Sequence, residues 1–353
     1  MNASPLSRRD TAFLKGIAIS LIVLHNFCHW LPLCVAENEY TFRTDRIWQY
    51  VSYLGHGGPH LLLNFFSHYG HYGVPLFLFL SGYGLVMKYE RTKVELIGVG
   101  TFMWRHACKL WWLMLPPLLA FFVIETIGDN WGHRPDQVFC LVAFVNNLQP
   151  VRDLILGPWW FFSLMMQLYL IYIVILRRWR GFKVLAAVVG FCWLLQAAAL
   201  GFDWRMDWGQ PDLDLFNYMR YNCIGSMLPF GVGIAMARWQ YMCSGWRCQV
   251  LGLVLLLLSA FNALLWLVSP VFLLMATLPL VRLVKSEQVK VVFVWLGGIS
   301  ACLFAVHPVV RAYTIGMAKT GAVYTGLVLY LVLSIGLALL MTILLKARKR
   351  WQK

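Results

Sequence analysis

About ten apolar runs occupy most of the chain, and each is close to the ~20 residues that an α-helix needs to cross a bilayer. Of the residues, 60% are hydrophobic and 13% are charged, whereas soluble domains carry ~25% charged residues. A large soluble core is therefore excluded. We predict an all-α fold, a polytopic membrane bundle of about ten transmembrane helices. The expected spans are 12–31, 72–89, 105–125, 157–177, 183–200, 221–238, 249–267, 270–284, 291–313 and 323–345.

Two segments complicate this pattern. The seventh and eighth runs are separated by little more than Ser269-Pro270, so we predict a tight hairpin at this dipeptide. The stretch 47–66 is apolar in part, but glycines and a proline interrupt it. We predict that it is an outer loop that faces the membrane and contains a short helix, rather than a span.

Charge along the chain predicts the orientation of the bundle. Most acidic residues lie in every second inter-span segment, and most Lys and Arg residues lie in the others, at 8–15, 88–109, 177–183, 238–247, 282–290 and 346–353. Short loops rich in Lys and Arg stay in the cytoplasm. We therefore expect both termini to be cytoplasmic. Residues 1–353 would form a single integral-membrane domain with a short basic tail at 346–353.

The net charge of +15 raises the alternative of a nucleic-acid partner. That function requires basic residues gathered on one polar surface. Here apolar runs separate the basic clusters. We therefore expect the lipid bilayer as a partner and no nucleic acid.

The first span carries three ionisable residues, Lys15, His25 and His29. Lys15 stands at the inner end, where its side chain can also snorkel to the headgroups. His25 lies ~15 Å further along the axis, and His29 follows one turn later on the same side. Ionisable groups are costly inside a bilayer. A single histidine in a helix is more often packed and hydrogen-bonded than functional. Two histidines at this spacing therefore indicate a polar cavity.

Four motifs follow one another along the chain: LKGIAISLIVLH at 14–25, GVPLFLFLSGYGL at 73–85, WFFSLMMQLYLIY at 160–172 and LFAVHP at 303–308. In these motifs and their order the sequence resembles the acyltransferase 3 family of multispan membrane O-acyltransferases. The resemblance covers nearly the whole chain. It implies about ten helices and the transfer of acyl groups, usually acetyl from acetyl-CoA, to hydroxyls of surface glycans and related acceptors.

The family pattern in the first helix is a basic residue, ten further residues and a histidine. Eleven steps of ~100° return to within ~20° of the start, so the two residues share a face. In this sequence the eleventh position after Lys15 is Asn26, and His25 is one residue short. The resemblance implies a catalytic set of His25, His29, Lys15 and Asn26. We rank His25 first as general base or acyl carrier, and His29 stays open as the alternative.

The family also has an Arg-Arg-x-x-Arg cluster at the cytoplasmic start of the third helix. The corresponding residues here are Arg105, His106 and Lys109. The resemblance implies that they hold the phosphates of acetyl-CoA, the acyl donor, with Lys15 as a further donor contact. The alternative interpretation is that these basic residues only follow the positive-inside rule of cytoplasmic loops and bind no ligand. We expect no metal.

Further polar and aromatic residues are candidates for the acceptor side. An oxyanion in the transition state needs hydrogen-bond donors, and Ser81, Tyr83 and Asn26 are the candidates. The remaining predicted substrate-binding residues are His68, His71, Trp159 and Gln167. Cys34 and Cys140 both fall on the expected outer side, where a disulfide is possible.

These observations together predict a membrane O-acyltransferase. It would move an acetyl group from cytoplasmic acetyl-CoA to a hydroxyl of a surface glycan or lipid-linked sugar outside the bacterial cytoplasmic (inner) membrane. The alternative is a transporter or flippase that uses the intramembrane polar residues as a pathway. Transporters often contain repeated halves, and we find no similarity between residues 1–170 and 180–350. An inactive scaffold is the third interpretation.

Overall fold

The structure is a computed structural model. It describes residues 6–58, 60–92, 97–129, 132–148, 154–201, 215–240 and 245–351. These residues form helices joined by short loops, and no strand occurs among them. The predicted all-α class is therefore confirmed for the described part of the chain.

The helices differ widely in length. The longer ones are α1 (Arg8–Cys28), α4 (Gly73–Tyr89), α5 (Val99–Ile127), α7 (Trp160–Ile171, which the π-helix Tyr172–Leu176 continues), α8 (Phe182–Gly201), α10 (Cys223–Trp239), α11 (Trp246–Ser259), α12 (Ala263–Thr277), α14 (Glu287–Lys319) and α15 (Val323–Trp351). The short ones are α2 (Thr44–Gly55), α3 (Leu61–Tyr69), α6 (Pro135–Val142), α9 (Leu215–Arg220) and α13 (Leu280–Leu283).

Each predicted apolar run overlaps one of the longer helices, but fewer of them are long enough to cross a bilayer. Within the described residues, 7 helical segments have the required length and hydropathy. The runs at 72–89, 221–238 and 249–267 correspond to α4, α10 and α11, which have 17, 17 and 14 residues. The chain is a multi-pass membrane protein, and a count of ten spans and the side of each terminus stay predictions.

The predicted hairpin at Ser269-Pro270 is wrong. Pro270 lies inside α12, and the turn between α11 and α12 is formed by residues 260–262. Asn262 caps α12, because its side-chain oxygen accepts a hydrogen bond of 3.0 Å from the Leu265 N–H. A proline inside a membrane helix is tolerated, since neighbouring groups satisfy the freed carbonyl. Helix α15 continues to Trp351 and so includes most of the predicted basic tail, and residues 352–353 lie outside the described part.

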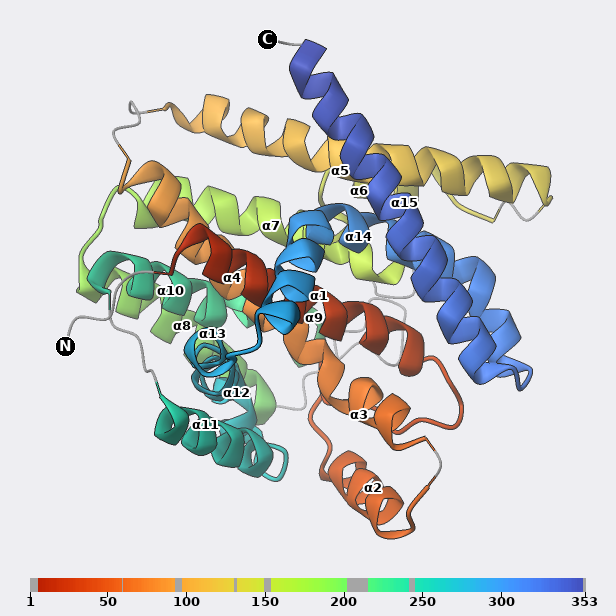
Figure 1. Cartoon of the computed structure of the whole chain (residues 1–353). Helices are drawn as coiled ribbons and strands as arrows, with labels where there is room; N and C mark the ends of the chain where they lie inside the picture. The colour runs from red at the N-terminus through yellow and green to blue at the C-terminus, as the bar shows by residue number, and fades with distance from the viewer. Residues whose placement is uncertain are drawn as a thin grey trace.

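Helix α1 lies at the centre of the bundle and packs against α14 and α4 (Figure 1). Glycines allow the close approach. A methyl group added to Gly16 would overlap the carbonyl of Phe293, and one added to Gly297 would overlap that of Ala12. Small residues at helix contacts are typical of membrane bundles, because they let the backbones approach. A glycine also allows α4 and α10 to approach closely, because a methyl group added to Gly82 would overlap the carbonyl of Phe230.

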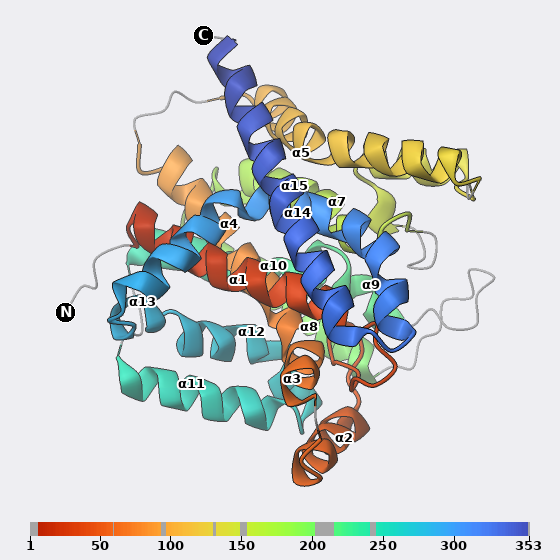
Figure 2. The same ribbon diagram turned by 45° about the vertical axis from the view of Figure 1, so that its right-hand side comes forward.

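Most of α2 and much of α3 lie within the stretch 47–66, and at 12 and 9 residues both helices are too short to cross a bilayer. Figure 2 shows α2 at the edge of the bundle, with α3 between it and α1. One side of α2 exposes Trp48, Val51 and Leu54. This amphipathic pattern is typical of a helix that lies along a membrane surface.

Candidate active site

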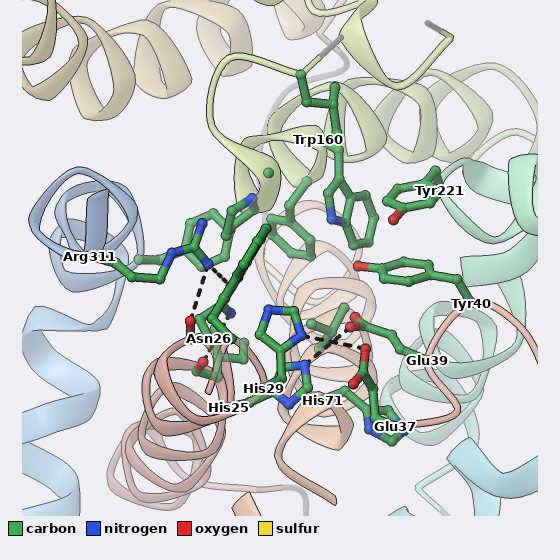
Figure 3. A pocket seen from close by; sticks show the side chains of 18 residues that line it. His25, Asn26, His29, Glu37, Glu39, Tyr40, His71, Trp160, Tyr221 and Arg311 are labelled. Atoms are coloured by element: carbon green, nitrogen blue, oxygen red, sulfur yellow. Dashed lines mark hydrogen bonds and ion pairs between the residues drawn. The ribbon is translucent and has the colours of Figure 1, made fainter. Parts of the chain in front are cut away.

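A cavity of ≈ 260 Å³ opens at the C-terminal end of α1, close to the lower limit of small-molecule sites at ~300 Å³. We call it the histidine cavity. Figure 3 shows its main side chains pointing toward one another from several parts of the chain. Its labelled lining residues are His25, Asn26, His29, Glu37, Glu39, Tyr40, His71, Trp160, Tyr221 and Arg311.

The imidazole of His25 is held in one orientation. Its Nδ1 lies 3.0 Å from the carbonyl oxygen of Ser67 and 3.2 Å from that of Phe66. Because carbonyl oxygens only accept hydrogen bonds, Nδ1 carries a proton. Nε2 has no hydrogen-bond partner among the described residues and lies 3.4 Å from Oε2 of Glu39. In the neutral ring, Nε2 therefore presents its lone pair beside a carboxylate.

His29 forms a second pair with Glu37. Its Nδ1 lies 3.5 Å from Oε1 of Glu37, and its ring centroid lies 4.7 Å from that of His25. Burial alone would raise the pKa of the Glu37 carboxyl. The contact with His29 and the neighbouring imidazoles outweigh this effect and hold the pKa below its ordinary value of 4.5. Glu37 is therefore ionised at neutral pH.

His71 completes the group of imidazoles. Its ring centroid lies 5.8 Å from that of His25, and burial lowers the pKa of His71 well below its ordinary value. It therefore stays neutral. A smaller cavity of ≈ 30 Å³ shares the His71 and Glu39 walls and extends along α4 to Leu78. That volume is sufficient for a water molecule.

Arg311 reaches into the histidine cavity from α14, on the side away from Glu37 and Glu39 in Figure 3. Its Nη1 donates to the backbone and side-chain oxygens of Asn26, at 3.2 and 3.0 Å. Only 9% of the residue is exposed. Asn26 itself donates one amide hydrogen to the Ile22 carbonyl, and its oxygens accept from Arg311, so this side chain positions Arg311.

Aromatic rings form another wall of the cavity. The rings of Tyr40 and Tyr221 stack with centroids 4.0 Å apart and planes 7° apart. Trp160 meets Tyr221 edge to face, with centroids 5.3 Å apart. Such rings combine apolar faces with polar groups. The wall therefore suits a ligand that has both C–H faces and hydroxyls, as a sugar has.

The cavity also contains a set of possible metal ligands. His25, His29 and Glu37 each offer one ligand atom, and these atoms lie within 4.8 Å of one another. Imidazole nitrogens and carboxylate oxygens suit Zn²⁺. A metal ion on Nε2 of His25 would occupy the lone pair that a general base needs. The two uses of this site therefore exclude one another.

Several residues that the sequence analysis proposed lie outside the two cavities. Lys15 is ten residues before His25 on α1, ~15 Å along the axis. The others bind elsewhere in the protein: Ser81 to the Phe77 carbonyl, Tyr83 to the Leu6 carbonyl, His68 to the Ala36 carbonyl, Trp159 to the Ala305 carbonyl, and Gln167 to Asn147 and the Cys223 N–H. His25, Asn26, His29 and His71 are the predicted residues that line the histidine cavity.

The three proposed donor-binding residues divide between two faces of α5. Arg105 and Lys109 are exposed, whereas His106 is buried. Nε2 of His106 lies 3.1 Å from the hydroxyl of Tyr89. The split follows from helix geometry, because positions i and i+4 share a face and position i+1 is turned ~100° away.

Two further results bear on points that the sequence analysis left open or did not identify. Cys34 and Cys140 are both free thiols, so no disulfide joins them. Glu37, Glu39 and Arg311 line the site but were not among the predicted residues. Arg311 could have been identified from the sequence, since a charged residue inside an apolar run indicates function. The two glutamates lie in the loop after α1, where acidic residues have no such signal.

Comparison with known families matches residues 12–346 to the acyltransferase domain of the acyltransferase 3 family. Comparison with curated proteins and with solved structures found no match. The matched region covers nearly the whole chain and includes every lining residue of the histidine cavity. The chain therefore belongs to the acyltransferase 3 family.

Proposed function

We propose that this protein moves an acetyl group from acetyl-CoA to a hydroxyl of a glycan or lipid-linked sugar. The reaction would take place in the histidine cavity. The observation that carries the proposal is the state of His25, whose Nδ1 is fixed by two carbonyls while Nε2 faces the cavity without a hydrogen-bond partner in the described residues. A general base needs this combination of fixed orientation and free lone pair.

In the proposed reaction, Nε2 of His25 takes the proton of the acceptor hydroxyl. The hydroxyl oxygen attacks the thioester carbonyl carbon and gives a tetrahedral intermediate. The C–S bond then breaks, and the CoA thiolate leaves with the proton returned by the imidazolium. Acetyl is thereby moved from sulfur to oxygen with no net change in protons.

Two neighbouring residues fit this chemistry. The carboxylate of Glu39, 3.4 Å from Nε2, would stabilise the positive charge that the ring gains. The guanidinium of Arg311, which shares the cavity, would donate to the oxyanion of the intermediate. Of the three oxyanion donors proposed from sequence, Ser81 and Tyr83 already donate to carbonyls and Asn26 binds Arg311. Arg311 therefore takes over this role.

The proposed topology places the two substrates on opposite sides of the bacterial cytoplasmic membrane. The donor is made in the cytoplasm, where the predicted orientation puts the basic loops. The acceptor would enter the histidine cavity from outside, past the Tyr40 and Tyr221 rings. A sugar ring can pack its C–H face on these rings while its hydroxyl points to His25.

The test is acetyl transfer by the purified protein in liposomes. Labelled acetyl-CoA is added on one side, and label is counted in a polysaccharide or lipid-linked sugar pool. We expect His25→Ala to lower the rate by about 10²- to 10⁴-fold, the usual range for a general base. His56→Ala is the matched control, since His56 is exposed and lies outside both cavities. Full activity in both His25→Ala and His29→Ala would contradict the proposal.

Two further measurements separate the alternatives. An acyl-histidine intermediate would leave label on the denatured protein, and His25→Ala would abolish it. Binding of acetyl-CoA would raise the unfolding temperature of the protein. A transporter of unrelated solutes would show neither transfer nor this increase.

A further inference from the structure

Arg177 stands where α7 ends, at the end of the bundle away from the histidine cavity. The last turn of this segment, Tyr172–Leu176, is a π-helix, and the N–H of Arg177 donates to the Tyr172 carbonyl at 2.7 Å. Turns of this kind often occur at functional sites. Here the turn brings the side chain inward, so that Arg177 is 6% exposed while Arg178 is exposed.

The buried side chain of Arg177 has a donor without an acceptor. Its Nε has no hydrogen-bond partner in the described part of the chain, and no ion pair involves it there. Other shielded arginines are satisfied. Arg238 binds Glu90 and the Leu176 carbonyl, Arg220 binds the Glu39 carbonyl, and Arg311 binds Asn26.

A second cation, Lys88, and two rings, Tyr89 and His106, lie around Arg177. Its Cζ lies 5.6 Å from the centroid of the Tyr89 ring, and Nζ of Lys88 lies 4.8 Å from the same centroid. The Tyr89 hydroxyl contacts Nε2 of His106, whose Nδ1 is also buried without a partner in the described residues. We call Arg177, Lys88, Tyr89 and His106 the Arg177 cluster.

The nearby carboxylate does not neutralise this cluster. Glu90 already receives two hydrogen bonds from Arg238, at 2.9 and 2.8 Å, and one from the Tyr172 hydroxyl. A buried charge without a partner is costly, because the protein interior replaces its hydration poorly. Buried cations are normally paired. The ligand-free protein therefore has an excess positive charge and unused donors in one place, which is the condition for binding an anion.

We propose that the Arg177 cluster binds a phosphoryl group of the acyl-CoA donor. This inference rests on the proposed function and changes which residues hold the donor. Two N–H groups of a guanidinium can donate to two oxygens of one phosphate at the same time. The Nδ1 of His106 can supply a further hydrogen bond. The exposed Arg105 and Lys109 then act at the entrance rather than at the bound phosphate.

The position of the Arg177 cluster suits an acyl donor that is bound at one end and reacts at the other. Tyr89 ends α4, and His71 lies two residues before the start of that helix. The 17 residues of α4 separate the cluster from the histidine cavity by ~25 Å. Phosphate binding at one end of α4 and thioester chemistry at the other would require an extended ligand, and the pantetheine arm of CoA is one.

The experiment compares Arg177→Gln with Arg178→Gln in the full-length protein in phosphatidylcholine nanodiscs. Acetyl-CoA is titrated and its dissociation constant is measured. We expect Arg177→Gln to weaken binding by about 10- to 100-fold, as for the loss of charge-assisted hydrogen bonds. Arg178→Gln should stay within about 2-fold of the wild type, since exposed charges contribute little. Arg177→Lys keeps the charge without the fork and should give an intermediate value.

A second readout separates binding from a structural role. Without ligand, Arg177→Gln should unfold at the same temperature as the wild type or higher, because it removes an unpaired buried charge. A lower unfolding temperature without ligand would make Arg177 structural and overturn the proposal. Unchanged acetyl-CoA affinity in Arg177→Gln would also overturn it.

A third arm distinguishes a lipid headgroup as the source of phosphate. If nanodiscs with phosphatidylglycerol stabilise the wild type but not Arg177→Gln, while both bind acetyl-CoA equally, the cluster holds lipid phosphate and the proposal fails. The proposed function is judged separately. Acetyl transfer by the wild type together with unaltered binding by Arg177→Gln refutes this inference alone, whereas a wild type that neither binds acetyl-CoA nor transfers acetyl refutes both.

Discussion

Replacement of Glu39 by Gln tests the chemistry of the histidine cavity most directly. Oε2 of Glu39 lies 3.4 Å from Nε2 of His25, and glutamine keeps the size of the side chain while it removes the charge. In the proposed reaction the ring becomes positive as it takes the hydroxyl proton. The carboxylate attracts this charge, so its loss should slow the transfer step and leave acetyl-CoA binding unchanged.

The size of the effect follows from the separation of the two charges. At 3.4 Å their attraction is about 1 kcal/mol in bulk water and about 5 kcal/mol at an effective dielectric constant of ~20. The Glu39 side chain is 12% exposed, which places the pair between these limits. A value of about 2.7 kcal/mol corresponds to a rate loss of about 100-fold.

The assay is single-turnover acetyl transfer at saturating acetyl-CoA, with Glu37→Gln as the matched variant. Glu37 is paired with His29 at 3.5 Å, so the two glutamate variants report on different histidines. If His25 is the base, Glu39→Gln loses more activity than Glu37→Gln, and His25→Ala loses more than His29→Ala. The reverse order in both pairs would assign the base to His29. A rate for Glu39→Gln within about 3-fold of the wild type would refute the electrostatic argument.

Four other outcomes are expected. Arg311→Gln should slow transfer by about 100-fold without weakening acetyl-CoA binding, as for a lost oxyanion donor, and an equal loss of binding would contradict that role. Gly70→Ala should lower both unfolding temperature and activity because its methyl group would overlap Cβ of His25, whereas Gly84→Ala meets no neighbour; equal effects would show that the close approach is unimportant. The pKa of Glu37 is depressed below 4.5, so its ionisation stabilises the fold above that pH and the stabilisation is lost as pH falls. The difference in unfolding temperature between the wild type and Glu37→Gln should therefore narrow from about pH 7 to about pH 3, and a constant difference would argue against the depressed pKa. Dialysis against a chelator should leave transfer unchanged, and a loss restored by Zn²⁺ would mean that the histidine cavity holds a metal instead of a free base.

The sequence indicated some of the site because that part obeys helix geometry. His25 and His29 share a face of α1, as positions i and i+4 must, and both line the cavity. Helix geometry also separates His106 from Arg105 and Lys109. The positions of Glu37 and Glu39 could not be predicted in this way, since they depend on how the loop after α1 folds back over α3.

The helix ends were less predictable for a different reason. Pro270 suggested a boundary because proline cannot donate the helical hydrogen bond, but the helix around it continues from Ala263 to Thr277. Ser81 and Tyr83 looked available as oxyanion donors from their place in the motif. The Ser81 hydroxyl instead donates to the carbonyl four residues earlier, at 2.8 Å. Polar groups inside an apolar helix satisfy such bonds locally before they can serve a ligand.

The placement of the histidine cavity bears on the kind of acceptor that can be used. His25 lies one turn before the end of α1, and its carboxylate partner comes from the loop that follows. A carboxylate deeper in the bilayer would have to come from another helix and would be costly there. We therefore expect the site to be shallow on the side where α1 ends, and its volume of ≈ 260 Å³ suits a small part of a larger molecule. In the proposed reaction, a long glycan would need to insert only the sugar that carries the reacting hydroxyl, while the rest of the glycan stayed outside the bundle.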